Sequence, residues 1–240
     1  MNTDSLRALW KTVFGDTDAF LDNFFRIAYS PDRCRFIEEN GDAICVLYWF
    51  DCSYSGGKLA YIYAVATHPQ HRGKGLASQL LQQTHEQLKQ MGYAGAVLKP
   101  AKGLFPFYKR LGYVTSGFIR RFYEKASTVP TDLTELTPEA YGRRRQAFLP
   151  PDAIIQDGIT LDFLHSYASF YAAGDALVCA LPQEGVIFEY LGNPHSAPGI
   201  LAALGISEAE IPTVGQEIPF SMFRPLNCTK TPGYLGISLE

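Results

Sequence analysis

The sequence has no long apolar run, no strong charge of either sign and no low-complexity segment, and each absence excludes a class of protein. Its longest apolar runs, such as residues 60–67, are far too short to span a bilayer, so we expect no membrane partner. A net charge of −3 gives no general attraction to phosphate backbones, so we expect no nucleic-acid partner either. The first four residues lead straight into a polar, amphipathic segment, which is not the pattern of a signal peptide.

Paired cysteines and metal-ligand spacing are also missing. The five cysteines are odd in number, and neither they nor the isolated His165 and His195 have a partner at ligand spacing. We therefore expect buried thiols in a reducing, cytoplasmic environment, and no metal.

What the sequence does contain is typical of a globular protein, with 47% hydrophobic and 19% charged residues. A length of 240 residues allows one large domain or two small ones. The pattern of helices and strands is interrupted at residues 126–132, where Ser127, Thr128 and Pro130 stand. We therefore predict two domains, residues 1–126 and residues 132–240.

The first of these parts alternates between strand and helix patterns. Apolar spacing predicts a helix at residues 6–14 and a second one that is capped by Asp16 and ends before Pro31. Strand-like stretches bounded by turn residues follow at residues 33–39, 43–50, 58–67, 93–98 and 113–123. Two more helices are predicted between the later strands, at residues 76–91 and 104–110.

The second part is predicted to be a smaller α+β unit. Thr137 and Pro138 open a helix, because proline is favourable at the first helical position. The remaining elements are predicted from apolar pattern and turn residues: a hairpin at residues 175–191, a helix at 196–204, and strands at 218–223 and 234–239.

The chemistry is concentrated between residues 60 and 113. Residues 60–66 are almost continuously apolar, which indicates a central strand covered on both faces. The loop Gln70-His71-Arg72-Gly73-Lys74-Gly75 follows this strand and opens a helix. The first N–H groups of a helix lack intrahelical partners, and glycines let a ligand approach the backbone closely. With two cations in the loop, this arrangement predicts a diphosphate site, although the glycines could also serve only to make a tight turn.

These residues resemble the signature of the GCN5-related N-acetyltransferases, which is Gln/Arg-x-x-Gly-x-Gly/Ala at the start of a helix after a central strand. The segment Phe107-Tyr108-Lys109-Arg110-Leu111-Gly112-Tyr113 is similar to a later motif of that family, a tyrosine followed by a Leu/Phe-Gly-aromatic turn. The resemblance covers residues 1–123. It implies an α/β (α+β) fold with a mixed central sheet flanked by helices. It also implies an enzyme that transfers an acetyl group from acetyl-CoA to an amine by direct attack.

The resemblance also implies roles for single residues. The CoA diphosphate would be held by the signature loop and the helix start, which comprise Gln70, Arg72, Gly73, Lys74, Gly75, Leu76, Ala77 and Ser78. The strand end would separate from its neighbour and pair with the pantetheine arm, and one of its N–H groups would polarise the thioester carbonyl; its residues are Val65, Ala66 and Thr67.

Tyr108 is the implied acid for the leaving thiolate. A phenol with a pKa of about 10 can donate a proton to a group of comparable basicity. The competing interpretation is a core tyrosine packed between Phe107 and Leu111.

No residue stands out as the general base that the attacking amine needs. Glu38, Glu39, Asp51 and His68 are candidates near strand ends, and the carboxylate of Glu240 is another. The acceptor is equally open. The lack of charge bias favours a small amine, but a protein amine is not excluded, and the oligomeric state cannot be read from the sequence.

Two other functions are compatible with part of this pattern. The segment Gly73-Lys74-Gly75-Leu76-Ala77-Ser78 is close to the dinucleotide fingerprint, but Ser78 replaces its third glycine. The acidic residue expected directly after the next strand is also absent, because Leu98 is followed by Lys99 and Pro100. A protein that binds acyl-CoA without catalysis is the second alternative, and the presence of Tyr108 argues against it.

Several residues have purely structural interpretations. We expect His71 and His85 at the surface, and Arg143, Arg144 and Arg145 on a solvated helix face. The element order of the second part echoes that of the first, so we consider a degenerate unit of the same family there, one that would help to wall the acceptor site.

Overall fold

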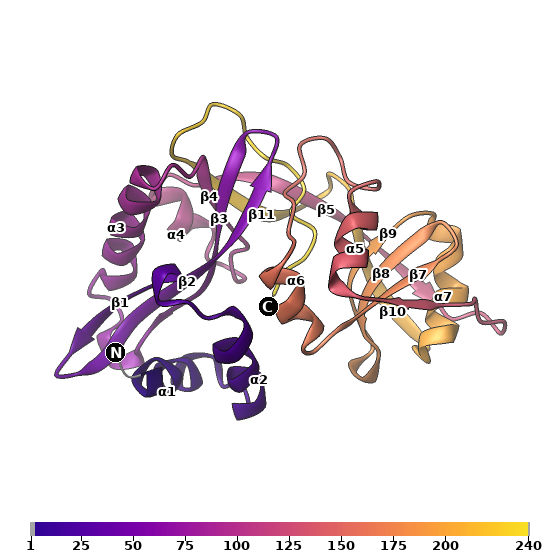
Figure 1. The fold of residues 1–240 in the computed structure, drawn as a ribbon, viewed down its shortest axis with the longest axis horizontal. Helices are drawn as coiled ribbons and strands as arrows, with labels where there is room; N and C mark the ends of the chain where they lie inside the picture. The colour runs from indigo at the N-terminus through magenta and orange to yellow at the C-terminus, as the bar shows by residue number, and fades with distance from the viewer. Residues whose placement is uncertain (1–2, 240) are drawn as a thin grey trace. The chain divides into compact units, whose positions relative to one another are not determined.

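The computed structural model describes residues 3–239, and the chain forms two compact units (Figure 1). The first unit is formed by the chain up to Cys52, by Gly56–Val114 and by Met222–Lys230. The second is formed by Ser53–Ser55, Thr115–Ser221 and the chain from Thr231 onward. A segment near the C-terminus thus belongs to the first unit. The division into domains at residues 126–132 stays a prediction.

The first unit is built on a mixed sheet in the order β1, β2, β3, β4 and β11. Strands β1 (Cys34–Glu39) and β2 (Asp42–Tyr54) are antiparallel, and Asn40 and Gly41, both at positive φ, form the hairpin turn between them. Strand β3 (Gly57–Thr67) runs parallel to β4 (Gly95–Leu98). Residues 222–225 of β11 (Ile218–Pro225) close this sheet antiparallel to β4.

Helices cover both faces of this sheet (Figure 1). Alternate residues of a strand point to opposite faces, so Leu47 and Ile62 pack with α3 (Leu76–Gln90) and α4 (Phe105–Arg110) on one side. On the other side Tyr48 and Tyr63 contact Trp10 of α1 (Thr3–Phe14), at ring-centroid distances of 5.4 and 5.7 Å. Among residues 3–239, no helix is both long enough and apolar enough to cross a membrane.

The predicted cap of the second helix was wrong. Helix α2 (Asp18–Asn23) is capped by Thr17, whose hydroxyl accepts a hydrogen bond from the Phe20 N–H at 3.2 Å. Asp16 instead accepts from the indole Nε1 of Trp10 at 2.7 Å. The helix continues as a π-helical turn, Phe24–Ala28, before Pro31.

The second unit also contains a mixed sheet, in the order β5, β10, β9, β8, β7 and β6. The strands are β5 (Val114–Lys125), β6 (Thr134–Leu136), β7 (Ser169–Ala173), β8 (Ala176–Leu181), β9 (Val186–Leu191) and β10 (Glu208–Val214). The helices are α5 (Pro138–Arg145), α6 (Ile159–His165) and α7 (Ala197–Leu204). The hairpin of β8 and β9 was predicted, whereas β6, β7, β10 and α6 were not.

The predicted strand at residues 234–239 is absent from the structure, which has no regular element there. Side chains and a loop satisfy this backbone instead of a neighbouring strand. Arg145 donates to the Leu235 carbonyl at 3.2 Å, Gln156 donates to the Ile237 carbonyl at 2.9 Å, and the Tyr234 carbonyl accepts from the Ile154 N–H. The apolar alternation that suggested a strand reflects burial of an irregular segment.

Arg145 does not lie on a solvated helix face, as the sequence suggested. Its side chain is 1% exposed and forms two hydrogen bonds, 2.7 and 2.8 Å long, with the carboxylate of Glu189. Tyr141 and Tyr234 also donate to this carboxylate, so Glu189 accepts four hydrogen bonds within the core. Burial opposes the charge of Arg145, but the carboxylate outweighs it and the pKa of Arg145 is raised.

We expect Arg145→Met to lower the free energy of unfolding by about 3–5 kcal/mol, because it leaves the Glu189 carboxylate buried without its counter-ion. Denaturant unfolding of the second unit measures this loss. Exposed Arg144 is the matched control, and Arg144→Met should change stability by less than about 0.5 kcal/mol. Equal effects of the two substitutions would show that the buried pair does not hold the unit together.

Candidate active site

The glycine loop leads into helix α3 with its backbone in the left-handed region. Gly73 has φ of 78° and Gly75, the residue before the helix, has φ of 80°. The first hydrogen bond of α3 runs from the Gln79 N–H to the Gly75 carbonyl. The N–H groups of residues 76–78 come before this bond and therefore have no acceptor within the helix. Positive partial charge therefore gathers at this helix end, as an anion site needs.

The loop differs from the expectation at Arg72. Its backbone N–H donates to the Pro69 carbonyl at 3.3 Å, and its side-chain Nε donates to the Thr67 carbonyl at 3.2 Å. The backbone donor of Arg72 is thus occupied by a 3₁₀ turn, Pro69–His71, and the guanidinium is the part of the residue that can meet an anion.

Strands β3 and β4 separate where the site begins. Their register runs from Leu59 opposite Gly95 to Tyr61 opposite Val97, after which β4 ends at Leu98 while β3 continues to Thr67. Ala64 of β3 has φ of 48°, a left-handed conformation that costs a non-glycine residue about 1–2 kcal/mol. The far end of β3 stays beside β2, because the His68 N–H donates to the Ile44 carbonyl at 2.9 Å.

A cavity of about 770 Å³ lies at this separation, and it brings together most of the residues singled out from the sequence. Tyr108, on α4, lines it together with the strand end, the loop and the helix start. The predicted site residues of those three segments that line it are Val65, Thr67, Arg72, Gly73, Gly75, Leu76, Ala77 and Ser78. The other three predicted site residues, Ala66, Lys74 and Gln70, do not line this cavity. Ala66 is buried on the opposite side of the strand end, as strand alternation requires, and Lys74 and Gln70 are exposed.

Several further residues line this cavity without any signal in the sequence pattern. Val13 and Phe14 at the end of α1, Leu104 before α4, and Phe107 and Arg110 on α4 all line it. Phe14 and Leu104 are large apolar residues with about 45% and 43% exposure, and such exposure was not readable from the pattern of either helix. These residues give the cavity an apolar wall beside its charged loop.

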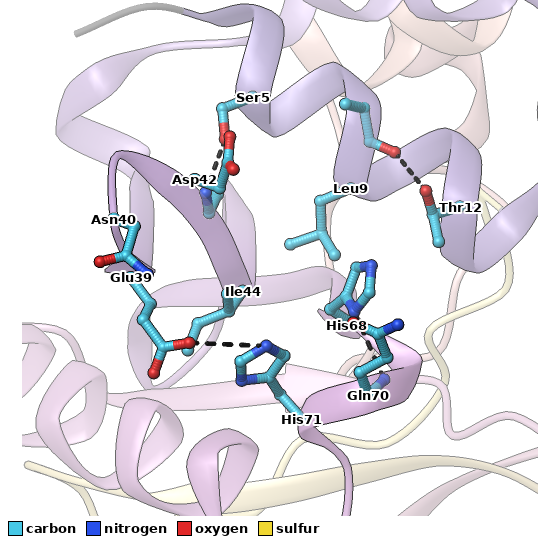
Figure 2. A pocket seen from close by; sticks show the side chains of 12 residues that line it. Ser5, Leu9, Thr12, Glu39, Asn40, Asp42, Ile44, His68, Gln70 and His71 are labelled. Atoms are coloured by element: carbon cyan, nitrogen blue, oxygen red, sulfur yellow. Dashed lines mark hydrogen bonds and ion pairs between the residues drawn. The ribbon is translucent and has the colours of Figure 1, made fainter.

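A smaller cavity of about 370 Å³ lies between α1, the β1–β2 hairpin and the loop (Figure 2). Gln70 and His68 line it, and His68 uses Nδ1 to accept from the Gln70 N–H at 3.3 Å. His71 lines both cavities, so it is not the surface residue that the sequence suggested; its Nε2 lies 3.7 Å from Oε2 of Glu39.

The four predicted base candidates do not line the larger cavity. Glu39 and His68 line the smaller one, and Glu38 is an exposed residue of β1. Asp51 accepts from the Tyr93 hydroxyl at 2.5 Å and lies 3.2 Å from Nζ of Lys58. Glu240 lies outside the described residues.

Behind Tyr108 a second aromatic layer contains a buried histidine. His85 of α3 is fully buried, in contrast to its predicted surface position, and its Nε2 lies 2.7 Å from the Tyr113 hydroxyl. The Tyr113 ring in turn meets the Tyr108 ring edge to face, with centroids 5.6 Å apart. Burial, and then the nearby guanidinium of Arg224, lower the pKa of His85 to about 3, so the imidazole is neutral.

Comparison with known proteins gives one family over the region that contains this site. Residues 2–115 match the acetyltransferase (GNAT) domain family. No curated protein sequence matches the chain. Among the described residues, no group of three or more histidine, cysteine or acidic side chains is placed to hold a metal ion.

Solved structures resemble the chain over almost its whole length. A GCN5-related N-acetyltransferase from Kribbella flavida has a TM-score of 0.68 at 17% identity, covering 93% of this chain and 69% of that one. A GCN5-related N-acetyltransferase from Anabaena variabilis gives 0.67 at 15% identity, covering 94% and 71%. A putative acetyltransferase from Pyrococcus horikoshii gives 0.65 at 13% identity, covering 98% and 88%. At such identities the likeness is one of fold.

The buried neutral histidine predicts a pH dependence of stability. The imidazole of the unfolded chain takes up a proton near pH 6.5, whereas folded His85 takes it up only near pH 3, so stability falls as the pH falls between these values. On going from pH 7 to pH 5, the free energy of unfolding should therefore fall by about 2 kcal/mol less in His85→Gln than in the wild type. Denaturant unfolding at both pH values measures this difference. Exposed His195 provides the control, because His195→Gln should keep the wild-type loss. An unchanged loss in His85→Gln would contradict a buried, neutral imidazole.

Proposed function

We propose that the chain transfers an acetyl group from acetyl-CoA to a primary amine of a small acceptor, because residues 2–115 match the acetyltransferase (GNAT) domain family, whose members are generally acyltransferases, and the fold resembles that of GCN5-related N-acetyltransferases. One observation carries this proposal. The cavity of about 770 Å³ is lined both by a helix start suited to a diphosphate and by the tyrosine suited to protonate a thiolate.

The charged end of the cavity fits the CoA diphosphate. The N–H groups of residues 76–78 and the Arg72 guanidinium are donors around the left-handed glycines, where the missing side chains leave room for the phosphates. Val13, Phe14, Leu104 and Phe107 supply apolar surface for the less polar arm of the cofactor.

The reacting end would lie where β3 leaves β4. There a backbone N–H near Val65 has no β4 partner opposite it and could donate to the thioester oxygen. In the proposed step the amine nitrogen attacks the thioester carbonyl carbon, and the tetrahedral intermediate expels the CoA thiolate. Tyr108 donates its hydroxyl proton to that thiolate. The proton that the amine loses goes to water, and a proton from water restores the Tyr108 hydroxyl. Among the described residues no carboxylate lines this cavity to take the amine proton directly.

The first test uses two glycines with the same backbone conformation at opposite ends of α3. Gly75 and Gly92 both have φ of 80° with open space around them, so a glutamate at either position costs similar backbone strain. We expect Gly75→Glu to weaken CoA binding by about 100-fold in calorimetry, because it places a negative charge at the diphosphate position. Gly92→Glu should bind CoA like the wild type. Equal affinity in the two variants, or no CoA binding by the wild type, would contradict the proposal.

The second test separates chemistry from binding. We expect Tyr108→Phe to lower the rate of thiol release from acetyl-CoA, measured with a panel of primary amines, by about 100-fold or more, because the thiolate loses its acid. The CoA dissociation constant should stay within about threefold. Tyr93→Phe is the control, since Tyr93 is buried away from this cavity and bonds to Asp51. Tight CoA binding without turnover of any amine by the wild type would favour a protein that binds acyl-CoA without catalysis.

A further inference from the structure

The turn that ends α4 is held by several backbone hydrogen bonds and by Arg224, and this turn fixes the backbone of Tyr108. The N–H groups of Leu111 and Tyr113 both donate to the Tyr108 carbonyl, at 2.9 and 3.2 Å. The guanidinium of Arg224 donates to the Leu111 carbonyl. Gly112, at φ of 83°, allows Arg224 to approach this closely, because a Cβ there would collide with Nη1 of Arg224.

The side chain of Tyr113 connects this turn to helix α3. Its hydroxyl lies 2.7 Å from Nε2 of His85, and both side chains are buried. Its ring supports one side of the Tyr108 ring, and the Phe107 ring contacts Tyr108 at a centroid distance of 5.0 Å. Neither His85 nor Tyr113 lines the cavity, so neither is placed to touch a substrate.

A histidine at this position is a costly choice for packing alone. Among the described residues no hydrogen-bond partner exists for its Nδ1, and burial, followed by the Arg224 guanidinium, disfavours its protonation. An apolar residue would fill the same place in the core between α3 and the sheet. The hydrogen bond to Tyr113 is what the imidazole adds.

We propose that His85 and Tyr113 are positioning residues, which hold the Tyr108 hydroxyl toward the cavity by fixing the ring of Tyr113 and, through it, the turn that ends α4. The inference rests on the proposed function of Tyr108 as the acid. It gives a role to Tyr113, the aromatic residue of the later family motif, and adds His85, which lies in neither motif and stands on the helix otherwise assigned to binding the diphosphate.

The test compares four single variants. His85→Leu and Tyr113→Phe each remove the hydrogen bond and keep the bulk, whereas His85→Gln keeps a side-chain amide within reach of the Tyr113 hydroxyl. Thr84→Val is the matched control, because Thr84 is the buried neighbour of His85 on α3 and its hydroxyl bonds only to the Leu80 carbonyl of the same helix. Thermal unfolding of each variant checks the fold, and calorimetry with CoA checks the diphosphate site.

We expect turnover at saturating acetyl-CoA to fall about tenfold in His85→Leu and in Tyr113→Phe, with the CoA dissociation constant within about twofold of the wild type. His85→Gln should recover turnover to within about threefold, and Thr84→Val should keep it. If turnover falls as much in Thr84→Val as in His85→Leu, or does not recover in His85→Gln, His85 only packs in the core and does not position Tyr108.

A second measurement keeps this inference separate from the proposed reaction. In protein labelled with ¹³C at the tyrosine ζ carbon, the Tyr108 signal is assigned by its loss in Tyr108→Phe. We expect this signal to shift or broaden in His85→Leu and Tyr113→Phe, and to return in His85→Gln. An unmoved Tyr108 signal would overturn the positioning role even if the enzyme is active. A moved signal in a protein without turnover would support the positioning role and contradict only the proposed reaction.

Discussion

The candidate site depends on the separation of β3 from β4. The two strands are paired over only three residue pairs, and β3 then continues alone while Ala64 takes a left-handed conformation. This parting leaves the backbone near Val65 without a partner on the β4 side and opens the cavity between the strand end and α4. It also sets where the chain leaves the sheet, and so where the glycine loop and the positive end of α3 lie. This one feature brings together the residues to which we assign diphosphate binding and proton donation.

Helices α3 and α4 of the first unit surround this opening and position its side chains. Helix α3 packs on one face of the sheet and contributes both the proposed anion-binding end and, two turns further along, His85. Helix α4 contributes Tyr108, and its short length makes the turn at residues 111–113 the main determinant of where that side chain lies. The same helix start that would hold the diphosphate thus belongs to a helix that also braces the proposed acid.

The second unit is organised by a different constraint. Glu189 and Arg145 are both buried, and each would be costly in the core without the other. Two tyrosines and the Leu235 carbonyl complete the hydrogen bonding, so the network ties β9, α5 and the irregular segment after residue 230 together. Burial first, and then the negative charge of Glu189, raise the pKa of Cys179 well above its usual value, so this thiol stays protonated in the core.

The sequence by itself determined the first unit's elements, the glycine loop and Tyr108, because these depend on local rules. Apolar periodicity, the Asn40-Gly41 turn, glycines at positive φ and a short motif are all readable within a few neighbouring residues. Only the tertiary structure decided which titratable side chains are buried and what they contact. His85 and Arg145 both read as surface residues of polar helices, yet their partners, Tyr113 and Glu189, lie 28 and 44 residues further along the chain. Residues 234–239 read as a strand because a buried irregular segment and a strand can share one apolar pattern. Such pairings depend on long-range packing, and no local pattern encodes which distant group will meet a given side chain.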